Sequence, residues 1–161
     1  MDLGVFPNSG QVLGLVAATV FGALIGFERQ LRGHPAGLHT NALVALGSAA
    51  FVITSVLIGD SSGPARVAGQ VVTGVGFLCA GVIMHQGVTV RGINTAATVW
   101  CASAVGVLAG FGQLWWAGLV AFVVVMANFI LHYVEHQIIK TQRAKPHPAH
   151  GERVDSGGDR V

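Results

Sequence analysis

The chain has 161 residues, of which 52% are hydrophobic and only 10% are charged, whereas soluble proteins carry about 25% charged residues. Its formal net charge at pH 7 is +2. This composition excludes an ordinary soluble domain and is typical of a protein that is embedded in a lipid bilayer.

Five apolar segments follow one another along the chain. Each is close to the roughly 20 residues that a helix needs to cross about 30 Å of hydrocarbon. The sequence therefore predicts an all-α, polytopic membrane protein with about five transmembrane helices within residues 1–139, followed by a disordered tail at residues 140–161. The segments are residues 11–27, 40–57, 67–84, 95–111 and 114–132.

Basic residues lie mainly on one side of the predicted helices. Arg29 and Arg32 follow the first segment, Arg91 follows the third and Lys140 follows the fifth, whereas only Arg66 lies on the opposite side. The positive-inside rule then places the N-terminus outside and the C-terminus in the cytoplasm. These scattered cations favour membrane lipid as a partner and do not indicate nucleic-acid binding.

Small residues recur at every fourth position in the first and fourth segments. Residues four apart share one helix face, and small ones let two helix backbones approach closely in lipid. We therefore predict a packing seam along each helix, and leave open whether the seams join helices of one chain or protomers of a homo-oligomer. The members are Gly14, Ala18, Gly22 and Gly26 in the first segment, and Thr98, Ala102, Gly106 and Gly110 in the fourth.

The third segment combines glycines with polar side chains. Gln70 and Thr73 lie in the same stretch as Gly74 and Gly76. We expect the polar side chains to hydrogen-bond to a neighbouring helix and the glycines to pack against it.

A polar cluster is predicted at the cytoplasmic ends of the helices. In one interpretation the arginines extend to the lipid headgroups, Glu28 pairs with one of them, and Thr40 and Asn94 cap helices. In the other, Glu28 and Arg91 anchor a connected polar site between helices. The cluster comprises Glu28, Arg29, Arg32, Thr40, Arg91, Asn94 and Thr95.

A second polar group is predicted at the outer side, where Asp60 and Arg66 form a loop ion pair and Gln70 lies nearby. A cation or proton pathway needs carboxylates at membrane depth, and Glu28 and Asp60 are the main candidates. The predicted topology separates these two by about 30 Å of hydrocarbon. The alternative function is therefore a transporter of magnesium, another cation or protons with a polar pathway involving Glu28 or Asp60, and an oligomer could place several copies of Glu28 around one axis.

The end of the fifth segment, His132 to His136, matches the His-x-x-Glu-His pattern of inverted zinc proteases, with Glu135 as the base. The pattern lies where a helix leaves the membrane, and no third ligand is well placed. We therefore predict no enzyme activity, no metal site and no cofactor, and keep a metalloprotease as a remote alternative.

Five ordered pieces of the sequence together resemble the MgtC/SapB family over about residues 10–135. The resemblance implies a bacterial inner-membrane protein of about five helices, linked to growth at low magnesium, acid stress and survival inside macrophages. It also implies a regulatory role, with ATP synthase as a proposed partner. The pieces are residues 22–33, 36–40, 43–49, 70–78 and 91–100.

The chain departs from this family pattern at three points. His39 stands where the pattern suggests arginine, and Cys79 stands where it suggests a small residue. We also expect no folded cytoplasmic domain after the fifth helix, unlike in longer members. The preferred hypothesis is thus a non-enzymatic protein that binds a membrane partner through its glycine-rich helix faces.

Overall fold

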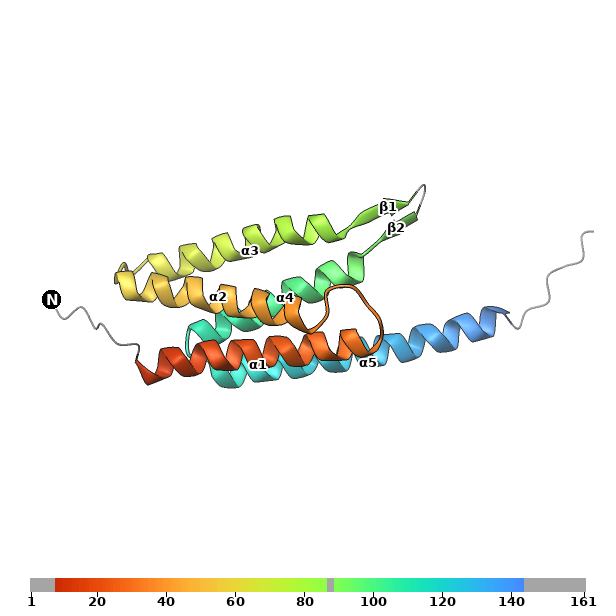
Figure 1. The fold of residues 1–161 in the computed structure, drawn as a ribbon, viewed down its shortest axis with the longest axis horizontal. Coiled ribbons are helices and arrows are strands. Elements are labelled where there is room, and N and C mark those ends of the chain that lie inside the picture. The colour runs from red at the N-terminus through yellow and green to blue at the C-terminus, as the bar shows by residue number, and fades with distance from the viewer. Residues whose placement is uncertain (1–7, 87–88, 144–161) are drawn as a thin grey trace, which may run out of the picture. The chain divides into compact units, whose positions relative to one another are not determined.

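The computed structural model describes residues 8–86 and 89–143 (Figure 1), although the side chains of residues 85, 86 and 135–143 are outside this description. The chain divides into two compact units, residues 1–128 and 129–161. The first unit holds four whole helices, a hairpin and the first part of a fifth helix. The second unit holds the rest of that helix.

Five helices are long and apolar enough to span a membrane, which confirms the predicted all-α, polytopic fold. The orientation of the two termini across the membrane stays a prediction. In chain order the elements are α1 (Ser9–Leu31), α2 (Leu38–Ile58), α3 (Gly63–Val82), β1 (Met84–Gln86), β2 (Thr89–Arg91), α4 (Ile93–Gly110) and α5 (Leu114–Arg143).

The connection between α3 and α4 is a short β-hairpin, where the sequence indicated only a turn. Helix α3 ends at Val82, because Ile83 adopts an extended conformation, so the third apolar segment does not stay helical to Met84. Strands β1 and β2 pair antiparallel, with Met84 opposite Arg91. Gly92 then enters α4 with a φ of 93°, and a Cβ there would overlap the carbonyl of Val82.

Helix α5 continues to Arg143, a few residues beyond the predicted start of the tail at residue 140. The remainder of the predicted disordered tail, residues 144–161, lies outside the described residues.

Helices α2 and α4 lie between α1 on one side and α3 on the other, and α1 also packs directly against α4 (Figure 1). Both α1 and α4 contact α2 through small residues. A Cβ added to Gly22 would lie 2.6 Å from the carbonyl oxygen of Asn41, and one added to Gly106 would overlap the carbonyl of Ala45. The predicted small-residue faces of α1 and α4 thus lie in seams within one chain.

The core between these helices consists largely of alanine. Small side chains let the helix backbones approach closely. Dispersion contacts between the closely packed backbones therefore hold the helices together in lipid, without large apolar side chains between them. The fully buried alanines are Ala18, Ala45, Ala49, Ala102, Ala109 and Ala117.

Helix α3 is much less enclosed than its neighbours. Only 11% of its membrane-spanning window is buried, compared with 44% for α2 and 50% for α4. A Cβ added to Gly74 or Gly76 would meet no other atom within 4 Å. The glycines of α3 therefore do not serve packing within the described chain.

These two classes of glycine predict opposite responses to one methyl group. Gly106→Ala should lower the free energy of unfolding by about 1–3 kcal/mol, because the new Cβ pushes α4 away from α2. Gly74→Ala should cause no loss, because its Cβ enters open space and alanine favours the helix. Unfolding by heat in detergent micelles measures both, and equal losses would contradict the assigned seams.

Candidate functional site

Arg29, in the last turn of α1, points into the protein and is only 3% exposed. Its Nη1 donates a hydrogen bond to Oγ1 of Thr98 at 3.0 Å, and its Nη2 donates to Oγ1 of Thr95 at 2.7 Å. A third, longer contact of 3.4 Å joins Nη2 to the carbonyl oxygen of Pro35. Arg29 therefore links α1 to α4 and does not extend to the headgroups.

Two threonines of α4 provide this contact because of their spacing. Thr95 and Thr98 are three residues apart and share one helix face. The hydroxyl of Thr98 donates its own hydrogen to the carbonyl oxygen of Asn94 at 2.9 Å, so that its lone pairs face the guanidinium. Both threonines are buried, at 4% exposure each.

Among the residues that the structure describes, Arg29 has neutral hydrogen-bond partners only. The adjacent carboxylate, Glu28, forms an ion pair with Arg32 one turn further along α1. Nε of Arg29 is buried and has no hydrogen-bond partner among the described residues. The carboxylate of Glu28 acts on Arg29 electrostatically but forms no described hydrogen bond with it, so the set of hydrogen bonds around this buried guanidinium is incomplete.

The loop after α1 holds the arginine in place. Gly33, with a φ of 70°, closes the helix, and the backbone N–H of His34 donates to the carbonyl oxygen of Arg29 at 3.1 Å. This is the Schellman arrangement of a helix end. The side chain of Asn41 then donates to the carbonyl oxygens of Ala36 and Gly37 at 2.7 and 2.9 Å, which fixes the loop against α2.

Arg29 lines a cavity of about 650 Å³, which lies at the same end of the helices as the β-hairpin. No aspartate or glutamate is among the described residues that line it, so the cavity is cationic. The structure brings together here most of the predicted inner cluster, whereas Glu28 and Arg32 form their separate pair. The polar lining is Arg29, His34, Thr40, Arg91, Asn94 and Thr95.

His34 is the polar lining residue that the sequence did not predict. It lies in the short segment between Gly33 and Gly37, and Pro35 beside it prevents helix continuation. Two glycines around a proline therefore signal a tight loop that returns to the helix end, but they do not reveal which side chains face inward.

The outer polar group separates into two places. Oδ2 of Asp60 accepts a hydrogen bond from Nη2 of Arg66 at 3.0 Å, and these side chains are 41% and 67% exposed. The backbone N–H of Ser62 also donates to Asp60, at 3.1 Å, and this bond is the main reason that the pKa of Asp60 is lowered. Gln70 instead lines a different, apolar groove.

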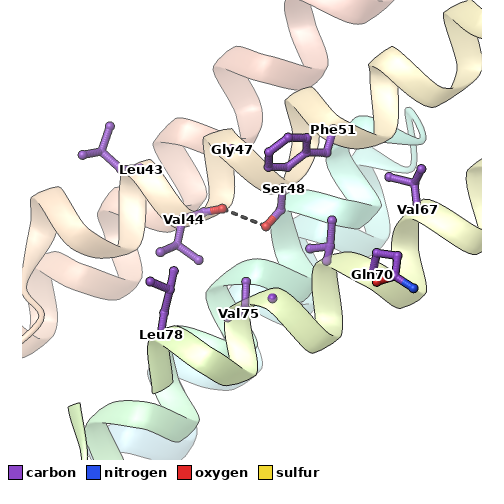
Figure 2. A pocket seen from close by; sticks show the side chains of 11 residues that line it. Leu43, Val44, Gly47, Ser48, Phe51, Val67, Gln70, Val75 and Leu78 are labelled. Carbon is purple, nitrogen blue, oxygen red and sulfur yellow. Dashed lines mark hydrogen bonds between the residues drawn. The ribbon is translucent and has the colours of Figure 1, made fainter. Parts of the chain in front are cut away.

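That apolar groove, of about 710 Å³, runs between α2 and α3 (Figure 2). Its walls include Leu43 and Phe51 from α2 and Leu78 from α3. Gly47 and Gly74 also line the groove, one from each helix, and a Cβ on either would meet no atom within 4 Å. The groove therefore combines an apolar lining with two glycines that have room for close backbone approach.

The polar groups of the groove are few. The hydroxyl of Ser48 donates to the carbonyl oxygen of Val44 at 2.8 Å, as Figure 2 shows, and lies 2.9 Å from the hydroxyl of Ser103 on α4. The hydrogen-bonding capacity of Ser48 is thus used within the protein, and an apolar partner would meet little desolvation cost at this side chain.

The described residues contain no group of three histidine, cysteine, aspartate or glutamate side chains that could hold a metal ion. The side chains of Glu135 and His136, on which the metalloprotease alternative depends, lie outside the description. The thiol of Cys79 donates to the carbonyl oxygen of Ala96 at 3.1 Å, a contact that joins α3 to α4.

A profile of the MgtC family matches residues 15–137. Protein MgtC of Salmonella typhimurium LT2 is 50% identical over 127 residues, which are 79% of this chain and 54% of the relative. Protein MgtC of Brucella abortus 2308 is 51% identical over 117 residues, or 73% of this chain and 49% of the relative. The chain thus spans about half the length of these relatives, and no solved structure gives a significant match.

The burial of Arg29 predicts a cost when one acceptor is removed. Thr95→Val should lower the free energy of unfolding by about 1–3 kcal/mol, because Nη2 loses its shortest hydrogen bond in a buried place. Thr73→Val is the matched control, since Thr73 is exposed and bonds only to Gly69 of its own helix. It should change stability by less than about 0.5 kcal/mol, and an equal effect of both changes would contradict the role of Thr95.

The lowered pKa of Asp60 predicts a pH dependence with a definite sign. Its carboxylate stabilises the fold above its unfolded pKa of about 3.9, and this contribution is lost as the pH falls through the lower folded pKa. Unfolding midpoints of wild type and Asp60→Asn should therefore differ at pH 6, begin to approach each other below about pH 4, and converge only below the lowered folded pKa of Asp60. A difference that does not change with pH would rule out the charge of Asp60 as its cause.

Proposed function

The chain belongs to the MgtC family, and from this premise we propose that it is a non-enzymatic protein of the bacterial inner membrane that binds another membrane protein. The proposed role is adaptation to low magnesium or acid stress and survival inside host cells, as the family resemblance suggests. The proposed partner is the membrane sector of ATP synthase. The N-terminus would lie outside, and the arginine cavity would face the cytoplasm.

The observation that carries this proposal is the groove between α2 and α3 (Figure 2). Helices associate in lipid through small residues, because apolar side chains gain little by leaving lipid for protein. Gly22 and Gly106 are already covered within the chain, whereas Gly47 and Gly74 are bare. The two bare glycines supply what a transmembrane helix of a partner would need.

Arg29 in the inner cavity favours binding over catalysis. The guanidinium of Arg29 and the hydroxyls of Thr95 and Thr98 are held in mutual hydrogen bonds. General acid–base catalysis needs a group that exchanges protons near neutral pH, and an arginine does not. A cationic site with fixed donors suits recognition.

The transport alternative has less support. Glu28 is paired with Arg32, and Asp60 is paired with Arg66 in an exposed turn. Both of these carboxylates therefore already have a positive partner, and neither lines one of the cavities described above.

The test fills the groove without changing the fold. Gly74→Trp should abolish co-purification with the membrane sector of ATP synthase and impair growth at low magnesium, because the indole occupies the space of the partner helix. Gly76→Trp is the matched control, since Gly76 is on the same helix, is equally open and does not line the groove.

Affinity purification from native membranes and a complementation assay measure the two effects. The control should retain partner and growth. Loss of both in the two variants alike, or retention of both in Gly74→Trp, would contradict binding through the groove. Loss of a different membrane protein in Gly74→Trp alone would reject ATP synthase as the partner.

A further inference from the structure

We propose that the arginine cavity between the loop after α1, the hairpin and the start of α4 binds a phosphate group. This site goes beyond the partner groove, since the two cavities share no lining residue. The observation behind it is a buried guanidinium whose described hydrogen-bond acceptors are all neutral and whose Nε has no acceptor among the described residues.

The first element is Arg29 itself. A guanidinium has five N–H donors, and the three acceptors available here are two hydroxyls and one carbonyl. Nε is buried without an acceptor. An anion in the cavity would add a negative charge to that of Glu28 and would offer further acceptor oxygens to the guanidinium.

A second cation lines the cavity. Arg91 ends β2, is exposed, and pairs in register with Met84, which also lines the cavity. Arg91 and Arg29 come from different elements but contribute to one cavity whose described lining contains no carboxylate. Two guanidinium groups on one site are typical of phosphate recognition, because their planar forks match its oxygens.

The start of α4 adds partial positive charge. Gly92 is its N-cap and provides no side-chain cap, unlike Asn8 at the start of α1. The first backbone N–H groups of a helix have no partner within the helix and attract anions. Asn94 and Thr95, in this first turn, line the cavity.

The chemistry favours phosphate over a carboxylate or a cation. Phosphate offers several oxygen acceptors and more negative charge, which suits donors that come from three elements. The cavity of about 650 Å³ has room for a phosphate together with the group that carries it. That group is either a lipid headgroup or a free phosphorylated solute, and the experiment separates these two sources.

The experiment uses the whole chain in neutral detergent. Inorganic phosphate is titrated against chloride at constant ionic strength, and binding is followed by the thermal unfolding midpoint. In parallel, native mass spectrometry counts phosphatidylglycerol molecules retained after mild delipidation. Phosphate stabilisation that added phosphatidylglycerol does not weaken indicates a free solute, whereas retained lipid that excludes phosphate indicates a headgroup.

Arg91→Gln is the main variant, because Arg91 is exposed and has no role in the helix seams. It should weaken phosphate or lipid binding about tenfold, the loss of one charge-assisted hydrogen bond. Arg91→Lys should restore part of the affinity. Arg66→Gln is the matched control, since it removes one exposed arginine from the Asp60 turn and should leave binding unchanged.

Arg29→Lys tests the buried fork with the charge retained, and should also weaken binding if it folds. The proposal is overturned if neither phosphate nor lipid binds the wild type, or if Arg91→Gln and Arg66→Gln reduce binding equally. The second result would show general attraction of anions to a basic surface.

Discussion

The structure depends on the burial of one guanidinium. Arg29 can remain inside the helix ends only because two hydroxyls of α4 accept its hydrogen bonds. These hydrogen bonds fix the position of α4 along the axis of α1. The small residues further along the helices are then placed against their partners, as Gly106 is against α2. The same contact opens the cationic cavity, since the loop that covers Arg29 cannot supply a counter-charge.

Close packing has a second consequence at the other side of the chain. The alanine core joins α1, α2, α4 and the start of α5, and it leaves only 11% of the membrane-spanning window of α3 buried, as little as in α5. The glycines on the covered faces of α1 and α4 allow contact between helix backbones, whereas Gly74 and Gly76 on α3 make no such contact. Small residues that are covered form the tight seams, and small residues that are left uncovered line the groove between α2 and α3.

Much of the fold could be predicted from sequence because membrane helices leave a strong signal in length and hydropathy. The period of four also located the faces that contain Gly22 and Gly106. The hairpin could not be predicted, because strands of three residues are too short to show an alternation of polar and apolar side chains. The inward direction of the Arg29 side chain could not be predicted either, because its hydroxyl acceptors lie on another helix.

The distance along the chain between Arg29 and its acceptors has a consequence for biogenesis. Thr95 and Thr98 lie 66 and 69 residues downstream, so the ribosome releases α1 long before α4 exists. Until then the guanidinium has to remain with water or headgroups at the membrane surface, as charged side chains do in lipid. Completion of α4 would draw it inward, which makes insertion of the fourth helix the step that commits the chain to its final packing.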